Sequence, residues 1–262
     1  MKSRRRSPSD APIDPDAFAA ALGDDSPAAR ERTTAALRDL TQQARSAGAK
    51  AVVSGRWLTD TTLRLAAHLP VRDRATLAAH HGGKTGPELA DALIRNAGRT
   101  SGGIGAVAGA LIGAQQFLPP AWVTVPFELA AETALVVALE MKLVAELHEA
   151  LDQPVPATGA QRGLLVAQSW AEKRGVNPQD LVLGVGAADI FGRQARTTLT
   201  IALRRRMTRR MGRSMAALIP MMAGAIAGAV LNRRATVAIG KTVAADLDRQ
   251  AMVTGRVVPI TA

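Results

Sequence analysis

The sequence predicts an all-α protein, a helical bundle with two glycine-rich apolar hairpin segments. Ala, Leu and Val dominate the 47% of residues that are apolar, whereas aromatic residues make up only 3% and Tyr is absent. This composition favours helices, because sheets are enriched in β-branched and aromatic side chains. No alternating run of Val, Ile or Thr indicates a strand. A chain of 262 residues is long enough for one large domain.

The first helices are predicted from capping residues and prolines. Residues 1–25 are rich in Pro, Ser, Asp and Ala without a sustained period, and we expect a disordered tail there. Ser26 and Pro27 favour a helix start, and Gly48 favours its end. Three further helices are expected from Trp57 to Leu69, from Arg72 to Ala79, and from Pro87 past Ile94.

Prolines divide the middle of the chain. Pro119, Pro120 and Pro126 are expected to break or turn it. After them we expect a helix over Leu129 to Leu151, a linker from Gln153 to Pro156, and a helix from Gln161 to Arg174. Residues 181–251 have a helical pattern almost throughout, with interruptions expected at Gly212, at Pro220 and near Asn232. One domain over residues 26–251 and a tail over 252–262 follow from this pattern.

Two uncharged apolar segments, Gly102 to Leu118 and Met215 to Leu231, are the most distinctive feature of the chain. Every fourth residue lies along one stripe of a helix, and glycine on such a stripe lets another backbone approach closely. We therefore predict that the two segments pack through the glycines that recur at this spacing: Gly105, Gly109, Gly113, Gly224 and Gly228.

The relation of these segments to a membrane stays open on the sequence. Each has 17 residues, at the short end of what a bilayer span requires. Arg213 precedes the second segment and Arg233 and Arg234 follow it, so the charges indicate no orientation. A shallow membrane hairpin and a hairpin buried inside a soluble bundle both fit better than a span.

Positive charge is concentrated at the C-terminal end. The chain has a net charge of +11, and residues 193–262 hold 13 Lys or Arg against 2 Asp or Glu. Leu203, Met207, Met211 and Met215 fall on one side of a predicted helix, a pattern typical of helices that lie on an anionic membrane surface. The arginines that we expect to bind this surface are Arg204, Arg205, Arg206, Arg209, Arg210 and Arg213.

Two alternatives to membrane binding are open for this basic helix. It can instead be a solvated face that packs onto the bundle through its methionines. Nucleic acid is the third interpretation, but no aromatic residue follows Phe191, which argues against recognition of bases by stacking.

No pattern predicts catalysis, a metal or a cofactor. Cys is absent, and residues 78–85 match a relaxed phosphate-loop pattern without the strand that such a loop requires. His80, His81 and His148 lack metal-ligand spacing with Glu146 or Glu149. Glu128 and Glu132 share a helical face, and we expect a solvated or salt-bridged pair there. A non-enzymatic protein is predicted.

The order of motifs carries a family resemblance. The stretch SGGIGAVAGAL at 101–111 is followed by LHEAL at 147–151 and by LIPMMAGA at 218–225, with Asn232 and Thr236 behind it. This order resembles the EcsC family of bacterial proteins over about residues 60–250. The chain departs from the family pattern at 148–149, where the family has Tyr-Gly, and at Ala223. The resemblance implies an all-helical, membrane-associated bacterial protein linked to transport or secretion, with no established catalytic residue.

These features together predict a non-enzymatic protein at the cytoplasmic face of a bacterial membrane. Residues 1–16 lack the apolar run of a signal peptide, so a cytoplasmic origin is expected. The expected partners are anionic lipid and a membrane protein complex. The alternative is a soluble helical bundle whose basic C-terminal face binds an acidic protein or nucleic acid. The sequence leaves the oligomeric state open.

Overall fold

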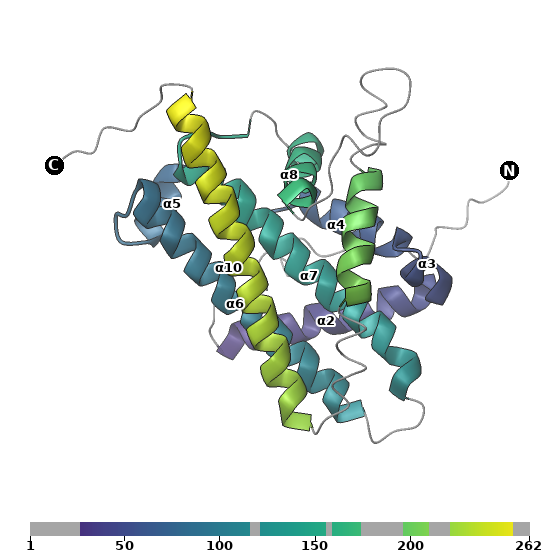
Figure 1. The fold of residues 1–262 in the computed structure, drawn as a ribbon. Coiled ribbons are helices and arrows are strands. Elements are labelled where there is room, and N and C mark those ends of the chain that lie inside the picture. The colour runs from purple at the N-terminus through teal and green to yellow at the C-terminus, as the bar shows by residue number, and fades with distance from the viewer. Residues whose placement is uncertain (1–26, 116–120, 156–158, 174–195, 210–220, 254–262) are drawn as a thin grey trace, which may run out of the picture.

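The computed structural model describes residues 27–115, 121–155, 159–173, 196–209 and 221–253 (Figure 1). These residues form helices and their connections, with no strand in the described ranges, which confirms the predicted all-α class. In chain order the helices are α2 (Pro27–Ala47), α3 (Ala49–Val53), α4 (Arg56–Ala67), α5 (Arg74–His80), α6 (Gly86–Gln115), α7 (Ala121–Ala150), α8 (Gly159–Lys173) and α10 (Met221–Val253). Residues 196–209, which carry no label in Figure 1, form a further helix between α8 and α10.

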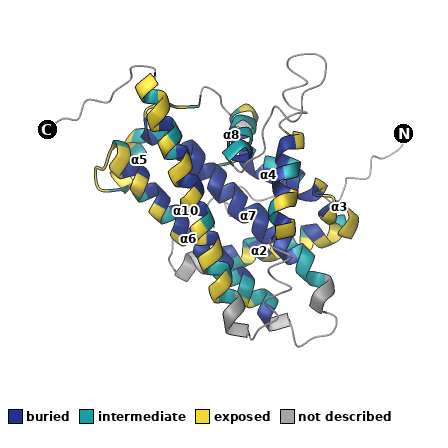
Figure 2. Ribbon diagram, viewed as in Figure 1, coloured by how far each residue is buried: buried dark blue, intermediate teal, exposed yellow. Residues whose placement is uncertain are grey.

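Helix α7 lies at the centre of the bundle. Every residue from Glu128 to Leu147 is buried, as the dark-blue length of this helix in Figure 2 shows. Helices α2, α4, α6, α8 and α10 all contact it. A helix surrounded on all sides needs a largely apolar sequence, and Ala, Leu and Val supply it over most of α7.

Helices α6 and α10 pack side by side in antiparallel orientation. Gly98 faces Val237, and Gly105 faces Gly228, so rising numbers on α6 meet falling numbers on α10. A Cβ atom on Gly228 would lie 2.5 Å from the carbonyl oxygen of Gly105, and one on Gly98 would lie 2.7 Å from Val237 Cγ2. Real Cβ atoms do not come this close to a neighbour, so the absence of side chains allows the two helices to approach.

The two apolar segments are parts of these two long helices. Residues 102–115 form the second half of α6, and residues 221–231 begin α10. The residues that would complete a hairpin on either segment, 116–120 and 210–220, lie outside the described residues. In the part of the chain that the structure describes, no helix combines the length and the hydropathy needed to cross a bilayer.

Most helix boundaries confirm the predictions. Helix α2 begins at Pro27 and ends before Gly48, which has a φ of 86°. Helices α4, α5 and α8 lie within a few residues of their predicted ranges, and residues 152–155 separate α7 from α8 as expected. The predicted tail over 1–25 and the predicted breaks at Gly212 and Pro220 lie outside the described residues.

Two predicted helix interruptions were wrong. Pro126 lies inside α7, where its missing N–H removes only one hydrogen bond near the helix start. Asn232 lies inside α10, because its side chain bonds to another helix and leaves the backbone helical. Helix α10 ends at Val253, within two residues of the predicted domain boundary at 251.

Candidate functional site

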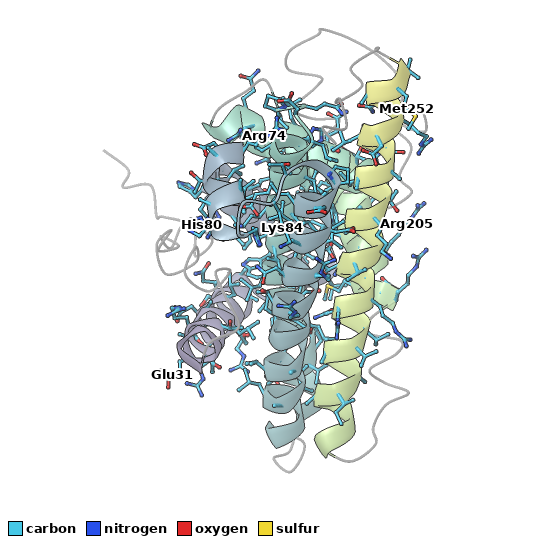
Figure 3. The ribbon with its side chains drawn as sticks, turned by 90° about the vertical axis from the view of Figure 1, so that its left-hand side faces the viewer. Glu31, Arg74, His80, Lys84, Arg205 and Met252 are labelled. Atoms are coloured by element: carbon cyan, nitrogen blue, oxygen red, sulfur yellow. The ribbon has the colours of Figure 1, made fainter. Side chains whose placement is uncertain are left out.

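The helix over residues 196–209 is amphipathic, as predicted. Leu203 and Met207 are buried in the core, whereas Arg204, Arg205 and Arg209 are exposed. Figure 3 shows Arg205 pointing away from the bundle, on the side where α10 lies. The other predicted members of this face and of its apolar side, Arg210, Arg213, Met211 and Met215, lie outside the described residues.

Helix α4 holds this basic helix in place. Thr200 Oγ1 lies 2.8 Å from Thr59 Oγ1, and Arg196 forms an ion pair of 3.5 Å with Asp60. A Cβ atom on Gly55 would lie 2.7 Å from Arg204 Cγ, so the chain before α4 leaves room for the stem of this arginine. Because of these contacts, the exposed arginines lie on a helix that is packed against the bundle.

Arg206 occupies a different position from the other arginines. Its side chain is 14% exposed, and its guanidinium donates two hydrogen bonds of 2.7 and 3.3 Å to the carboxylate of Glu140. Trp170 Nε1 donates to the same carboxylate at 2.8 Å, and Thr236 Oγ1 donates to it at 3.1 Å. Arg206 is therefore the ion-pair partner of the fully buried Glu140 and is not part of the exposed basic face.

The two glutamates expected to pair on α7 have separate partners. Glu128 Oε1 accepts from Arg45 Nη2 at 3.3 Å, and Glu132 Oε1 accepts from Asn232 Nδ2 at 2.8 Å. Both glutamates are buried, so the expectation of a solvated face was wrong, while the salt bridge to Glu128 was correctly anticipated. These contacts tie α7 to α2 and to α10.

The residues considered for catalysis or metal binding do not gather into a site. His148 Nδ1 is hydrogen-bonded to the carbonyl of Gln153 at 3.0 Å, and burial lowers the pKa of this histidine. Helix α5, not a strand, precedes the loop over 81–85 that resembles a phosphate loop. Within the described ranges, no group of three His, Cys, Asp or Glu is arranged to hold a metal ion.

A buried ion pair on α7 was not anticipated. Lys142 Nζ donates to Glu146 Oε1 at 2.5 Å, with both side chains almost fully buried. Burial lowers the pKa of Lys142, because the charged ammonium is desolvated. The sequence did hold a signal for these buried charges, both here and at Glu140: each is a charged residue within an otherwise apolar helix.

Two of the five predicted packing glycines meet directly, Gly105 and Gly228. Gly109 is half-buried and Gly113 is buried, and both lie on α6, whereas Gly224 lies on α10. Three glycines outside the prediction also face the partner helix or its neighbours: Gly98, Gly102 and Gly240. Gly98 and Gly102 are four residues apart, the same spacing as in the predicted glycines. This spacing could have predicted that the contact with α10 extends toward the N-terminus of α6.

Charge is ordered along the α6–α10 pair. One end carries exposed charges of both signs, with Glu88 and Asp91 near the start of α6 and Asp248 and Arg249 near the end of α10. Toward the middle the exposed charged residues are all basic: Arg95 and Arg99 on α6, and Arg233, Arg234 and Lys241 on α10. Beyond them, neither helix carries a charged residue, and Figures 1 and 3 show this end of the pair projecting past α2.

The projecting end also exposes apolar side chains. Ile226 is 62% exposed, Val230 40% and Leu231 39%, and all three lie on α10 before Arg233. Neither α6 over 102–115 nor α10 over 221–232 carries a charged residue, and we call these two ranges together the charge-free end. Ile226, Val230 and Leu231 lie within it. A row of exposed aliphatic side chains beside arginines is a candidate contact surface.

No protein-family model, curated protein or solved structure matches this chain. The resemblance to the EcsC family therefore stays a prediction from the motifs. The physical evidence about function lies in the exposed arginines, the buried network around Glu140 and the charge-free end.

Proposed function

We propose that the protein binds the surface of an anionic membrane through its exposed arginines. The proposal rests on the exposure of Arg204, Arg205 and Arg209. In the described part of the chain, these three arginines form no ion pair with any residue. Guanidinium groups form strong charge-assisted hydrogen bonds with phosphate, the group that lipid heads present. Arg233 and Arg234 on α10 are exposed as well and add to the same charge.

An anionic membrane fits these arginines better than nucleic acid does. Sequence-tolerant nucleic-acid binding depends on aromatic side chains for base stacking, and no aromatic residue follows Phe191. Lipid headgroups require no such groups, because they are bound through charge and through adjacent apolar surface. The exposed aliphatic residues of α10 supply that second requirement.

The proposed location is the cytoplasmic face of a bacterial membrane, in keeping with the EcsC resemblance. Anionic lipid in the cytoplasmic leaflet attracts basic segments, at about 1 kcal/mol for each Lys or Arg near the surface. We propose a non-enzymatic role, with a membrane complex of transport or secretion as the further partner.

Flotation with lipid vesicles tests the proposal. Replacing Arg204, Arg205 and Arg209 together with Gln removes three charges, which is about 3 kcal/mol of attraction and about two orders of magnitude in affinity. The substituted side chains are exposed, so the bundle should stay folded. Affinity is read as the fraction of protein that floats with vesicles containing 30% anionic lipid.

A charge-matched control separates these positions from net charge. Arg38, Lys50 and Lys84 are also exposed and lie on α2, on α3 and in the loop before α6. Their triple Gln variant has the same net charge and should bind almost as well as the unmodified protein. Equal losses in both variants would contradict a role for the basic helix. Strong binding to RNA or to an acidic protein, with none to vesicles, would favour the alternative function instead.

A further inference from the structure

We infer that the protein meets the bilayer end-on, with the charge-free end of α6 and α10 entering one leaflet. The inference rests on the proposed membrane binding and adds an orientation and a depth to it. Its basis is the order of charge along the helix pair, which runs from an end with both signs, through a stretch whose exposed charges are all basic, to an end without charge. A basic stretch beside an uncharged apolar end matches the headgroup and hydrocarbon layers of an anionic membrane.

The exposed aliphatic residues lie where such an orientation requires them. Ile226, Val230 and Leu231 face outward at the charge-free end of α10. Val107 and Leu111 are half-buried on the adjoining part of α6, which runs antiparallel to it. Transfer of exposed aliphatic side chains out of water is favourable, so a bilayer interface would stabilise this end.

The length of the charge-free end matches one leaflet. The twelve residues from Met221 to Asn232 form a helix of about 18 Å at 1.5 Å per residue. One leaflet contributes about 15 Å of hydrocarbon, half of the bilayer core. Insertion of this end therefore brings Arg233 and Arg234 to the depth of the headgroup phosphates, where long basic side chains are favourable.

The polar side chain of Asn232, at the border of the charge-free end, already has a partner within the bundle, because Asn232 donates to Glu132. Away from the helix ends, the backbone groups of α6 and α10 are also bonded within their own helix. These bonds lower the cost of placing the two helices in hydrocarbon, which comes mainly from polar groups without partners.

Single labelled cysteines measure this orientation directly. The protein contains no Cys, so Ile226→Cys, Ala238→Cys and Met252→Cys each give one attachment site for an environment-sensitive fluorophore. All three positions are exposed, and Figure 3 shows Met252 at the end of α10 far from the charge-free end. With anionic vesicles, the probe at 226 should shift to the blue and be quenched by quenchers on the lipid chains. The probes at 238 and 252 should stay accessible to an aqueous quencher.

Paired serine variants test the energetic contribution. Ile226→Ser with Val230→Ser should weaken vesicle binding by roughly tenfold or more, since two exposed aliphatic side chains no longer enter the bilayer. The control, Met252→Ser with Val253→Ser, removes two apolar side chains that are even more exposed, at the other end of α10, and should bind as the unmodified protein does.

The outcomes separate the orientation from the function. Vesicle binding with a fully aqueous probe at 226, or with equal depth at 226 and 252, would overturn the end-on orientation and leave membrane binding standing. Shielding of the probe at 226 without lipid, increasing with protein concentration, would assign the charge-free end to a second copy of the chain. Absence of vesicle binding in every labelled protein would overturn the proposed function as well.

Discussion

Substitution of Gly105 by Ala tests the contact between α6 and α10 most sharply. A Cβ atom at this position would lie 2.6 Å from the carbonyl carbon of Gly228, still nearer to its oxygen, and 2.7 Å from Asn232 Nδ2. Ordinary contact distances start near 3.5 Å, so the helices must separate by about 1 Å. The obstacle is backbone, which cannot rotate away as a side chain can, and overpacking of this kind costs about 1–3 kcal/mol.

Gly103 supplies the matched control on the same helix. A Cβ atom there has no neighbour within 4 Å, so Gly103→Ala gains only the helix preference of Ala, about 1 kcal/mol. We expect the Gly105 variant to be less stable than the unmodified protein and the Gly103 variant to be at least as stable. The two should differ by about 2–4 kcal/mol, which is about 5–15 °C in Tm for a domain of this size.

Thermal and denaturant unfolding, followed by the helical circular dichroism signal, measures this difference. The m-value should be similar in both variants, because the surface exposed on unfolding hardly changes. Equal stability of the two variants, or a more stable Gly105 variant, would refute the glycine contact between α6 and α10.

Further predictions concern the buried charges. Glu140→Gln leaves Arg206 without its ionic partner and should cost about 3–5 kcal/mol in denaturant unfolding. The control Glu149→Gln breaks a partly exposed pair with Arg162 and should cost about 1 kcal/mol or less. Burial lowers the pKa of His148 below 6.5, so the unfolded chain takes up this proton first and stability falls as the pH drops below 6.5. Tm measured between pH 7.5 and 5.5 should therefore fall less in the His148→Asn variant.

Local signals in the sequence predicted the helices well. Pro27 and Gly48 mark the ends of α2 because their effects on the backbone are intrinsic to those residues. At Pro126 and Asn232 the prediction was wrong because tertiary contacts outweigh the local preference of the residue. Each disfavours a helix locally, but the packing of α7 in the core and the bond from Asn232 to Glu132 outweigh that preference.

The contacts between residues far apart in the chain could not be predicted from the sequence. Arg206 and Glu140 are separated by 66 residues, and nothing in the spacing around Arg206 distinguishes it from Arg205. Only the packing of the helix over 196–209 against α7 turns one arginine inward and leaves its neighbour exposed. The glycine spacing, by contrast, predicted that the two apolar segments pack together, and Gly105 of α6 meets Gly228 of α10.

Binding of the unmodified protein to vesicles is the most direct test of the central claim. We expect the protein to float with vesicles containing anionic lipid at about 50 mM salt and to bind neutral vesicles weakly. It should be largely released at about 1 M salt, where surface charge is screened beyond about 3 Å. A protein that stays with the aqueous fraction in the presence of both vesicle types at low salt would contradict the claim that its arginines bind a membrane surface.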